Sequence, residues 1–205
     1  MVAGSILPFT IHQGKVYFLF GKENALADTP GFSDFGGGVE NKETPYDTAL
    51  REGAEELTGF LGDSIQIKKH IGKNGGVYKI VNGTYHSHVI YVDYDENLCK
   101  YYNQNHSFLW NRMDQKMLND SCLFEKIEIK WFSIRDMKKH KKQFRDFYQQ
   151  IVDQIVSEVP AILKHFGKKL VSSTRGSRNS RKVGKNKTMK KGKYEKRNEK
   201  NKRGG

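Results

Sequence analysis

The chain has 205 residues, a formal net charge of +13 and two cysteines. Cys99 and Cys122 show no metal-ligand spacing and give no disulfide framework, and no apolar stretch approaches the length of a membrane span. No basic residue precedes the short apolar run at the N-terminus, so we expect neither secretion nor membrane insertion and infer an intracellular, reducing location.

The positive charge is concentrated at one end of the chain. Residues 168–205 contain sixteen Lys and Arg residues and two Glu residues, whereas residues 1–167 have a net charge of −1. The C-terminal segment has almost no apolar content, so it cannot bury enough surface to offset the entropy of ordering. We therefore expect one domain over residues 1–167 and a disordered Lys/Arg-rich tail over residues 168–205.

The first predicted elements are two strands, residues 6–11 and residues 15–20. The residues His12-Gln13-Gly14 between them fit the turn of a hairpin.

A helix is predicted next. Thr44 is a good N-cap, Pro45 suits the first helical position because it has no N–H to lose, and Asp47 stands where a capping box places its acid. Gly59 supplies the stop.

Three carboxylates lie close together on this helix. Glu55 and Glu56 follow Glu52 by three and four positions, so all three lie on one face within an arc of roughly 100°. The opposite side carries apolar residues, namely Tyr46, Leu50, Ala54 and Leu57. An acidic helix face is often simply solvated, but hard oxygen ligands in this arrangement suit Mg²⁺ or Mn²⁺.

The remaining predicted elements follow in chain order. Residues 65–71 fit a strand, and residues 77–81 and 84–93 fit a hairpin around an Asn82-Gly83 turn. Residues 96–121 are ambiguous and helical in part. A strand is expected over residues 127–132, a helix cap at Ser133 and Asp136, and an amphipathic helix over residues 143–156.

The spacing of the acidic residues resembles the Nudix box. That pattern is Gly, five residues, Glu, seven residues, then Arg-Glu-apolar-any-Glu-Glu-any-Gly-apolar. The chain reads Gly37, five residues, Glu43, seven residues, then Arg51-Glu52-Gly53-Ala54-Glu55-Glu56. Phe35 replaces a common proline, Gly53 replaces a bulky apolar residue, and Thr58 is an extra residue that delays the closing glycine to Gly59. We expect close packing at Gly53 and a helix end lengthened by one residue.

The resemblance implies an α/β protein, a Nudix-type α/β/α sandwich with a mixed sheet. It also implies a pyrophosphohydrolase that acts on a nucleoside diphosphate joined to another group, with Mg²⁺ or Mn²⁺ as cofactor. The metal is needed because a glutamate cluster would otherwise repel a polyphosphate. The chain is also similar to decapping-type Nudix proteins of large DNA viruses in the segments DFGGGVE and KWFSIRDM.

The same resemblance implies a role for each matching residue. The implied metal ligands are Glu52, Glu55, Glu56 and the carbonyl of Gly36. Arg51 would orient the carboxylates, Glu43 would support the loop or a further metal, and Gly37 is the supporting box glycine. The general base varies across the family, and we favour Glu52, with Glu125 as a second candidate because it lies shortly before the final strand.

The substrate is less determined than the chemistry. We expect the tail to bind RNA phosphates without reading sequence, with nuclear targeting or an acidic protein surface as alternatives. Such an arm favours capped RNA as substrate, beside a nucleoside polyphosphate. A noncatalytic Nudix-fold nucleotide- or RNA-binding module and a basic RNA-associated structural protein are the other function classes. The sequence does not determine the oligomeric state.

Four aromatic residues lie in the ambiguous stretch, namely Tyr101, Tyr102, Phe108 and Trp110. They have the chemistry to stack a nucleobase. The commoner arrangement, which we favour, is a small hydrophobic cluster under the loop.

Overall fold

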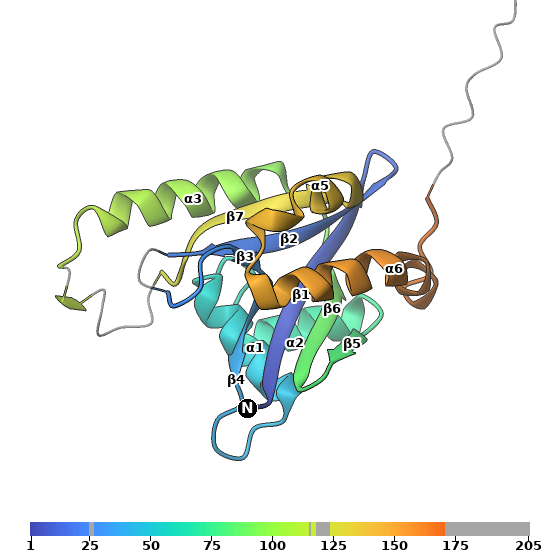
Figure 1. Ribbon diagram of the computed structural model, residues 1–205, viewed down its shortest axis with the longest axis horizontal. Coiled ribbons are helices and arrows are strands. Elements are labelled where there is room, and N and C mark those ends of the chain that lie inside the picture. The colour runs from blue at the N-terminus through green and yellow to red at the C-terminus, as the bar shows by residue number, and fades with distance from the viewer. Residues whose placement is uncertain (25–26, 115, 118–123, 171–205) are drawn as a thin grey trace, which may run out of the picture. The chain divides into compact units, whose positions relative to one another are not determined.

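Figure 1 shows the computed structural model of the protein, which describes residues 1–24, 27–114, 116–117 and 124–170. The predicted tail lies outside the described residues from residue 171 onward, and so does Cys122. The strands are β1 (Ala3–His12), β2 (Lys15–Glu23), β3 (Phe32–Ser33), β4 (Phe35–Gly38), β5 (Tyr78–Asn82), β6 (Tyr85–Tyr91) and β7 (Lys126–Ser133). The helices are α1 (Pro45–Glu56), α2 (Ser64–Lys73), α3 (Glu96–Trp110), α5 (Ile134–Lys139), the short η1 (Lys141–Gln143) and η2 (Asp146–Tyr148), and α6 (Gln149–His165).

Strand β1 is the centre of one mixed sheet. It pairs in parallel with β6, and β5 pairs antiparallel with β6 beyond it. On its other side, the N-terminal half of β1 pairs with β4 and the C-terminal half pairs with β2. β2 then continues beside β7 and β3. The sheet therefore forks, with β4 on one branch and β2 with β7 on the other.

The sheet is covered on both faces. Neighbouring residues of β1, Ile6 and Leu7, belong to two different hydrophobic cores, as strand alternation requires. One core is completed by α5 and α6, and the other by α1, α2 and α3. In Figure 1, α6 crosses in front of the sheet while α1 and α2 lie behind it. The predicted α/β/α sandwich with a mixed sheet is confirmed.

Helix α1 begins as predicted. The Asp47 backbone N–H donates to Thr44 Oγ1 at 3.2 Å, and the Thr44 backbone N–H donates to Asp47 Oδ2 at 3.1 Å, so the capping box is complete. Gly53 packs closely, as expected: a Cβ at this position would lie 2.3 Å from Cδ1 of Ile6 in β1. The missing side chain is what lets α1 approach the centre of the sheet.

The expected lengthening of α1 is wrong. The helix ends at Glu56, and Thr58 adopts a left-handed φ of +47°. The N–H of Thr58 donates to the Glu55 carbonyl at 2.8 Å, and the N–H of Gly59 donates to the Ala54 carbonyl at 3.0 Å. This pair of bonds is a Schellman motif, in which glycine usually takes the position held here by Thr58.

The strand predicted over residues 65–71 is also wrong, because these residues lie in α2. Asp63 and Gln66 form a capping box at its start, and Ile67 and Ile71, four residues apart, are both buried. Ile65 is 76% exposed. The spacing of the three isoleucines fits a strand as well as a helix, so the cap and the packing decide the element.

The other elements follow the sequence prediction with shifted bounds. In the second hairpin Asn82 pairs with Tyr85, so Gly83, with a φ of +59°, and Thr84 form the loop. The ambiguous stretch contains α3, and the last helix begins at Gln149 after two short 3-10 turns. Within the described residues, no helix is long and apolar enough to cross a membrane.

Candidate functional site

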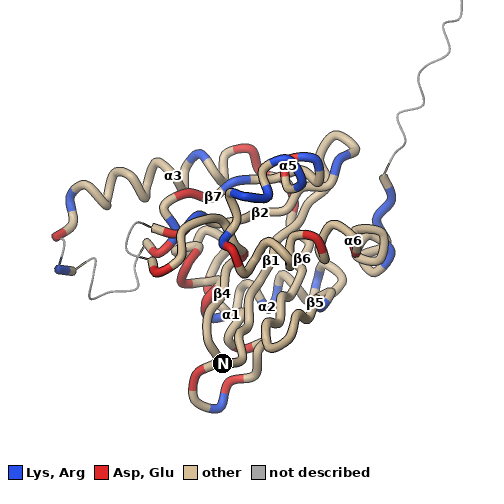
Figure 2. The backbone as a smooth tube through the Cα atoms, in the orientation of Figure 1, with Lys and Arg blue, Asp and Glu red and all other residues tan. Residues whose placement is uncertain are grey.

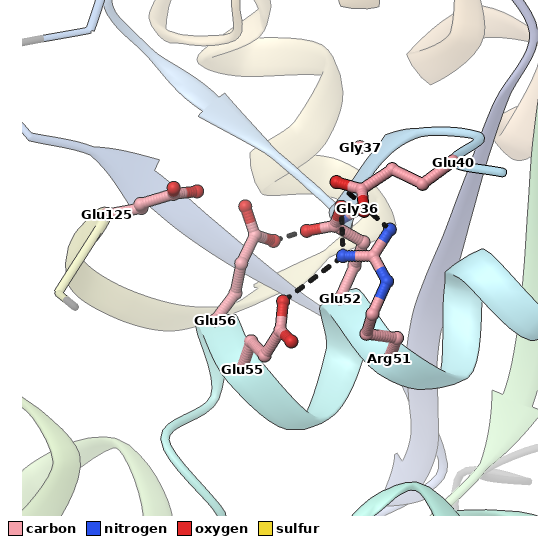
Figure 3. A pocket seen from close by; sticks show the side chains of 8 residues that line it. All are labelled: Gly36, Gly37, Glu40, Arg51, Glu52, Glu55, Glu56 and Glu125. Carbon is pink, nitrogen blue, oxygen red and sulfur yellow. Dashed lines mark hydrogen bonds and ion pairs between the residues drawn. The ribbon is translucent and has the colours of Figure 1, made fainter. Parts of the chain in front are cut away.

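A pocket of about 520 Å³ lies between α1, β4 and the start of β7 (Figure 3). Most of the residues that line the pocket are acidic. The full lining is Gly36, Gly37, Glu40, Arg51, Glu52, Glu55, Glu56 and Glu125. Seven of these eight are residues that the sequence singled out, and Glu40 is the addition. Glu43, the remaining predicted residue, lies behind Arg51 and not in the pocket lining.

Arg51 organises the acidic face of α1. Its Nε and Nη2 donate to the two Glu43 oxygens at 2.9 and 3.1 Å, and its Nη1 donates to Glu52 Oε1 at 2.9 Å and Glu55 Oε2 at 3.2 Å. The Arg51 hydrogen bonds, helped by Thr48, lower the pKa of Glu43 to about 2. One guanidinium therefore fixes three carboxylates.

Glu52 and Glu55 differ in their surroundings. The side chain of Glu55 is 52% exposed, whereas that of Glu52 is only 14% exposed. Desolvation raises the pKa of Glu52, and the neighbouring charge of Arg51 opposes that rise. A Cβ on Gly37 would lie 2.3 Å from Glu52 Oε1, so any other residue here would displace the Glu52 carboxylate from its present position.

Glu56 contradicts the expectation of one exposed acidic face. The residue is 5% exposed, because both branches of the forked sheet contact its carboxylate. The Gly36 N–H on β4 donates to Oε2 at 2.8 Å, and Lys126 Nζ on β7 lies 3.1 Å from Oε1. Burial raises the pKa of the Glu56 carboxyl well above its ordinary value, although Lys126 opposes the effect.

Lys126 is the main residue that sequence reasoning missed. Its side chain is 1% exposed and forms ion pairs with Glu56 and Glu23. Arg145 Nη1 also contacts Glu23, at 2.7 Å. Burial lowers the pKa of Lys126, but the two carboxylates outweigh burial and the net shift is upward. The result is a network of two acids and two bases, buried except for partly exposed Arg145, that ends at the pocket residue Glu56.

A β-bulge explains why the pattern concealed Lys126. Glu128 pairs with Lys22, but Lys126 and not Ile127 pairs with Glu23, so one extra residue interrupts the register. Strict alternation would put Lys126 on the same face as Glu128 and Lys130. The bulge turns Lys126 toward α1 instead, where Gly21 leaves room for its methylenes.

Glu125 reaches the pocket from the segment before β7. Phe124, the preceding residue, has a φ of +62°, which is uncommon for a bulky side chain. The Asn24 N–H donates to the Glu125 carbonyl at 2.7 Å and fixes this turn to the end of β2. The strained turn directs Glu125 toward the α1 carboxylates, as Figure 3 shows.

The carboxylate oxygens of the pocket suit a hard divalent cation, but their side chains do not point at a single common position. Among the described residues, no three acidic, histidine or cysteine side chains lie close enough together to coordinate one metal ion as they stand. Arg51 lies between Glu52 and Glu55, and Lys126 holds Glu56. The protein's own cations thus neutralise only part of the charge, and a metal ion would have to draw the Arg51-bound carboxylates together.

No family model and no curated protein matches the chain. A Caenorhabditis elegans Ap4A hydrolase structure is 14% identical, with a TM-score of 0.49 over 80% of this chain and 99% of that one. The NUDIX domain of Shewanella oneidensis NrtR with ADP ribose is 12% identical, with a TM-score of 0.45 over 78% and 88%.

A third solved structure is the bifunctional NMN adenylyltransferase/ADP ribose pyrophosphatase of Francisella tularensis, complexed with AMP and a Mn ion. It is 17% identical, with a TM-score of 0.43 over 77% of this chain and 41% of that one. Similarity at these levels carries no argument about the activity of this protein, which has to be argued from its own residues.

Proposed function

We propose that the protein is a metal-dependent Nudix-type hydrolase that cleaves a pyrophosphate bond in a nucleoside diphosphate joined to another group. The observation that carries the proposal is the convergence of five glutamates from three chain segments on one pocket, three of which, Glu52, Glu55 and Glu56, stand at the spacing of the Nudix box. A structural role does not need five like charges around an open pocket, because their repulsion destabilises the fold.

The pocket residues fit Mg²⁺ or Mn²⁺ by their chemistry, because hard cations prefer carboxylate and carbonyl oxygens. Glu52, Glu55 and Glu56 on α1 would hold the metal, with the carbonyl of Gly36. When bound, the metal would neutralise the phosphates and activate water.

The side chains of the protein would position the metal ligands and accept a proton from water. Arg51 keeps Glu52 and Glu55 fixed until the substrate arrives, and Glu43 keeps Arg51 in place. Glu52 is the preferred general base or water-activating ligand: its side chain is only 14% exposed, and desolvation raises its pKa toward the range in which a carboxylate accepts a proton effectively. Glu125 faces the same pocket from the opposite side and is the second candidate.

Capped RNA is the substrate we favour within this class. A net charge of +14 over residues 168–205 would attract a long polyanion far more strongly than a mononucleotide, which offers few phosphates. The competing proposal is a noncatalytic module that binds nucleotides or RNA. The Arg51 contacts to three carboxylates favour the enzyme, because binding alone does not require so ordered an acidic cluster.

The test is a hydrolysis panel with Mg²⁺ or Mn²⁺, comparing wild type with Glu55→Gln. The panel covers capped RNA, nucleotide sugars, dinucleoside polyphosphates, oxidised nucleoside triphosphates and inositol pyrophosphates. Glu96→Gln is the matched control, because Glu96 is an exposed helical glutamate outside the pocket. We expect Glu55→Gln to lose nearly all turnover while the control keeps it. Equal activity of the two variants would refute the metal assignment, and no turnover by wild type on any substrate would favour the binding module.

A further inference from the structure

Helix α3 and the turn after it have an unusual composition. From Asn97 to Met113 the chain contains no Asp or Glu, and it carries amide, aromatic and basic residues instead. In Figure 2, α3 has few charged positions, whereas acidic residues gather around α1 and β4. Lys100 and Arg112 form no ion pair with any described residue. Arg112 Nη1 donates to the Phe108 carbonyl at 3.0 Å, but no carboxylate of a described residue neutralises either charge.

The inner side of α3 is firmly attached to the body. The Tyr102 hydroxyl lies 2.7 Å from the Glu56 carbonyl and 3.0 Å from the Lys126 carbonyl. The Asn103 side chain hydrogen-bonds both the N–H and the carbonyl of Ile129 on β7. These contacts fix α3 beside the pocket, so its outer side is a rigid surface.

The outer side presents two large rings to solvent. Tyr101 is 54% exposed and Phe108 is 56% exposed. They lie seven residues apart and therefore on one side of the helix, separated by about 10.5 Å along its axis. That distance is about three steps of stacked bases at roughly 3.4 Å each. The predicted hydrophobic cluster accounts for Tyr102, which is buried, but not for these two rings.

Each exposed ring has a basic neighbour. The Arg112 guanidinium lies 3.8 Å from the centre of the Phe108 ring, and Lys100 Nζ lies 5.4 Å from the centre of the Tyr101 ring. Beside the Phe108 ring, a shallow groove is lined by Asn103, Gln104, Ser107, Phe108, Asn111 and Arg112. Rings with adjacent cations and amides are the groups that bind single-stranded nucleic acid, through stacking, phosphate contacts and base edges.

We propose that the outer side of α3 binds single-stranded RNA, with bases stacked on Tyr101 and Phe108 and phosphates near Lys100 and Arg112. A protein partner fits less well, because the two rings are separated by amides and make no contiguous apolar centre. This surface is distinct from the metal pocket and needs no metal. It would hold the body of an RNA by its bases, whereas the basic tail contacts phosphates alone.

The test compares two probes of equal length with the full-length protein in EDTA: a labelled single-stranded RNA and the same ribose-phosphate chain without bases. Fluorescence anisotropy gives the affinity for each. The tail binds both probes alike, because both carry the same phosphates. Wild type should prefer the probe with bases. Tyr101→Ala and Phe108→Ala should each weaken binding to that probe about fivefold or more and leave the abasic probe unchanged.

Phe147→Ala is the matched control, because Phe147 is 43% exposed and has Arg145 5.0 Å from its ring centre, far from α3 in sequence. It should not change the preference. Equal binding of the two probes by wild type overturns the proposal. An unchanged preference for the probe with bases in the Tyr101→Ala/Phe108→Ala double variant also overturns it, and would indicate that the two rings contact a protein partner instead. Because EDTA prevents metal-dependent turnover, this result is independent of the hydrolase proposal.

Discussion

Two carboxylates are buried on opposite faces of the same sheet, and the protein accommodates them in different ways. Asp34, between β3 and β4, is 1% exposed and accepts hydrogen bonds from three hydroxyl groups, those of Ser5, Tyr85 and Ser87. Glu56, at the end of α1, is 5% exposed and is held by the Lys126 ammonium and the Gly36 N–H. Burial raises the pKa of both carboxyls.

The difference follows from what lies beyond each group. Hydroxyls satisfy Asp34 without adding charge, so its cluster ends within the core. The Lys126 ammonium also binds Glu23, which in turn binds Arg145, so the Glu56 cluster is a chain of charges connected to the open pocket. A buried acid supported by neutral donors is a structural feature, whereas one supported by alternating charges at a pocket suits a site that receives charged ligands.

Removing the ammonium should have the largest effect. Lys126→Met leaves Glu56 and Glu23 buried with Arg145 as the remaining base, so we expect a loss of about 3–5 kcal/mol in the free energy of unfolding. Lys141→Met is the control, because Lys141 forms an exposed pair with Asp153 and should cost about 1 kcal/mol or less. Urea unfolding measures both. Similar losses in the two variants would show that the buried charge is unimportant.

Displacing α1, the helix that carries Glu56, should have the second largest effect on stability. Gly53→Ala would place a Cβ against Ile6, so we expect destabilisation of about 1–3 kcal/mol despite the better helix propensity of alanine. Gly72 lies inside α2, and a Cβ there would meet nothing within 4 Å. Gly72→Ala should therefore stabilise by about 1 kcal/mol. Two shifts of the same sign in thermal unfolding would contradict this explanation.

The hydroxyl-bound acid should tolerate neutralisation better than Glu56 tolerates the loss of Lys126. Asp34→Asn keeps one acceptor oxygen but brings an amide group among three hydroxyl donors, so we expect a loss of about 1–3 kcal/mol at neutral pH. The measurement is again urea unfolding. A loss as large as that of Lys126→Met would mean that the two buried clusters are not different in kind.

The pH dependence of stability also tests the Asp34 cluster, because the direction of its pKa shift determines whether stability rises or falls with pH. The pKa of Asp34 is raised by burial from its ordinary value of 3.8. The folded protein therefore keeps this proton after the unfolded chain has lost it. The contribution of Asp34 to stability is full below pH 3.8 and declines as pH rises through the raised pKa. The stability advantage of wild type over Asp34→Asn should shrink as pH rises above 3.8, and an advantage that grows would contradict the shift.

The smallest effect should come from the end of α1, just beyond Glu56. Thr58 occupies a left-handed position that glycine adopts without strain, so Thr58→Gly should stabilise the protein by about 1 kcal/mol. Thermal unfolding should show a rise of a few degrees. A fall would indicate that contacts of the Thr58 side chain outweigh the backbone strain.

The sequence by itself determined much of this protein. The capping residues Thr44, Pro45 and Asp47 specify where α1 begins, and strand alternation specifies β1, β2 and most of β7, because these signals are local. The spacing from Gly37 to Glu56 indicated the pocket residues of α1, Arg51, Glu52, Glu55 and Glu56, since residues three and four apart on a helix must be neighbours. It also predicts close packing at Gly53, whose neighbour in the fold is Ile6.

Only the tertiary structure decided the remaining features, and each depends on contacts between distant segments. The bulge in β7 exists because β2 sets the register, so no local pattern could place Lys126 beside Glu23 and Glu56. Glu56 is buried because two branches of a forked sheet meet over it, although helix periodicity alone puts it beside Glu52 and the exposed Glu55. Residues 65–71 form a helix because α2 packs on the α1 side of the sheet, where Ile67 and Ile71 are buried together.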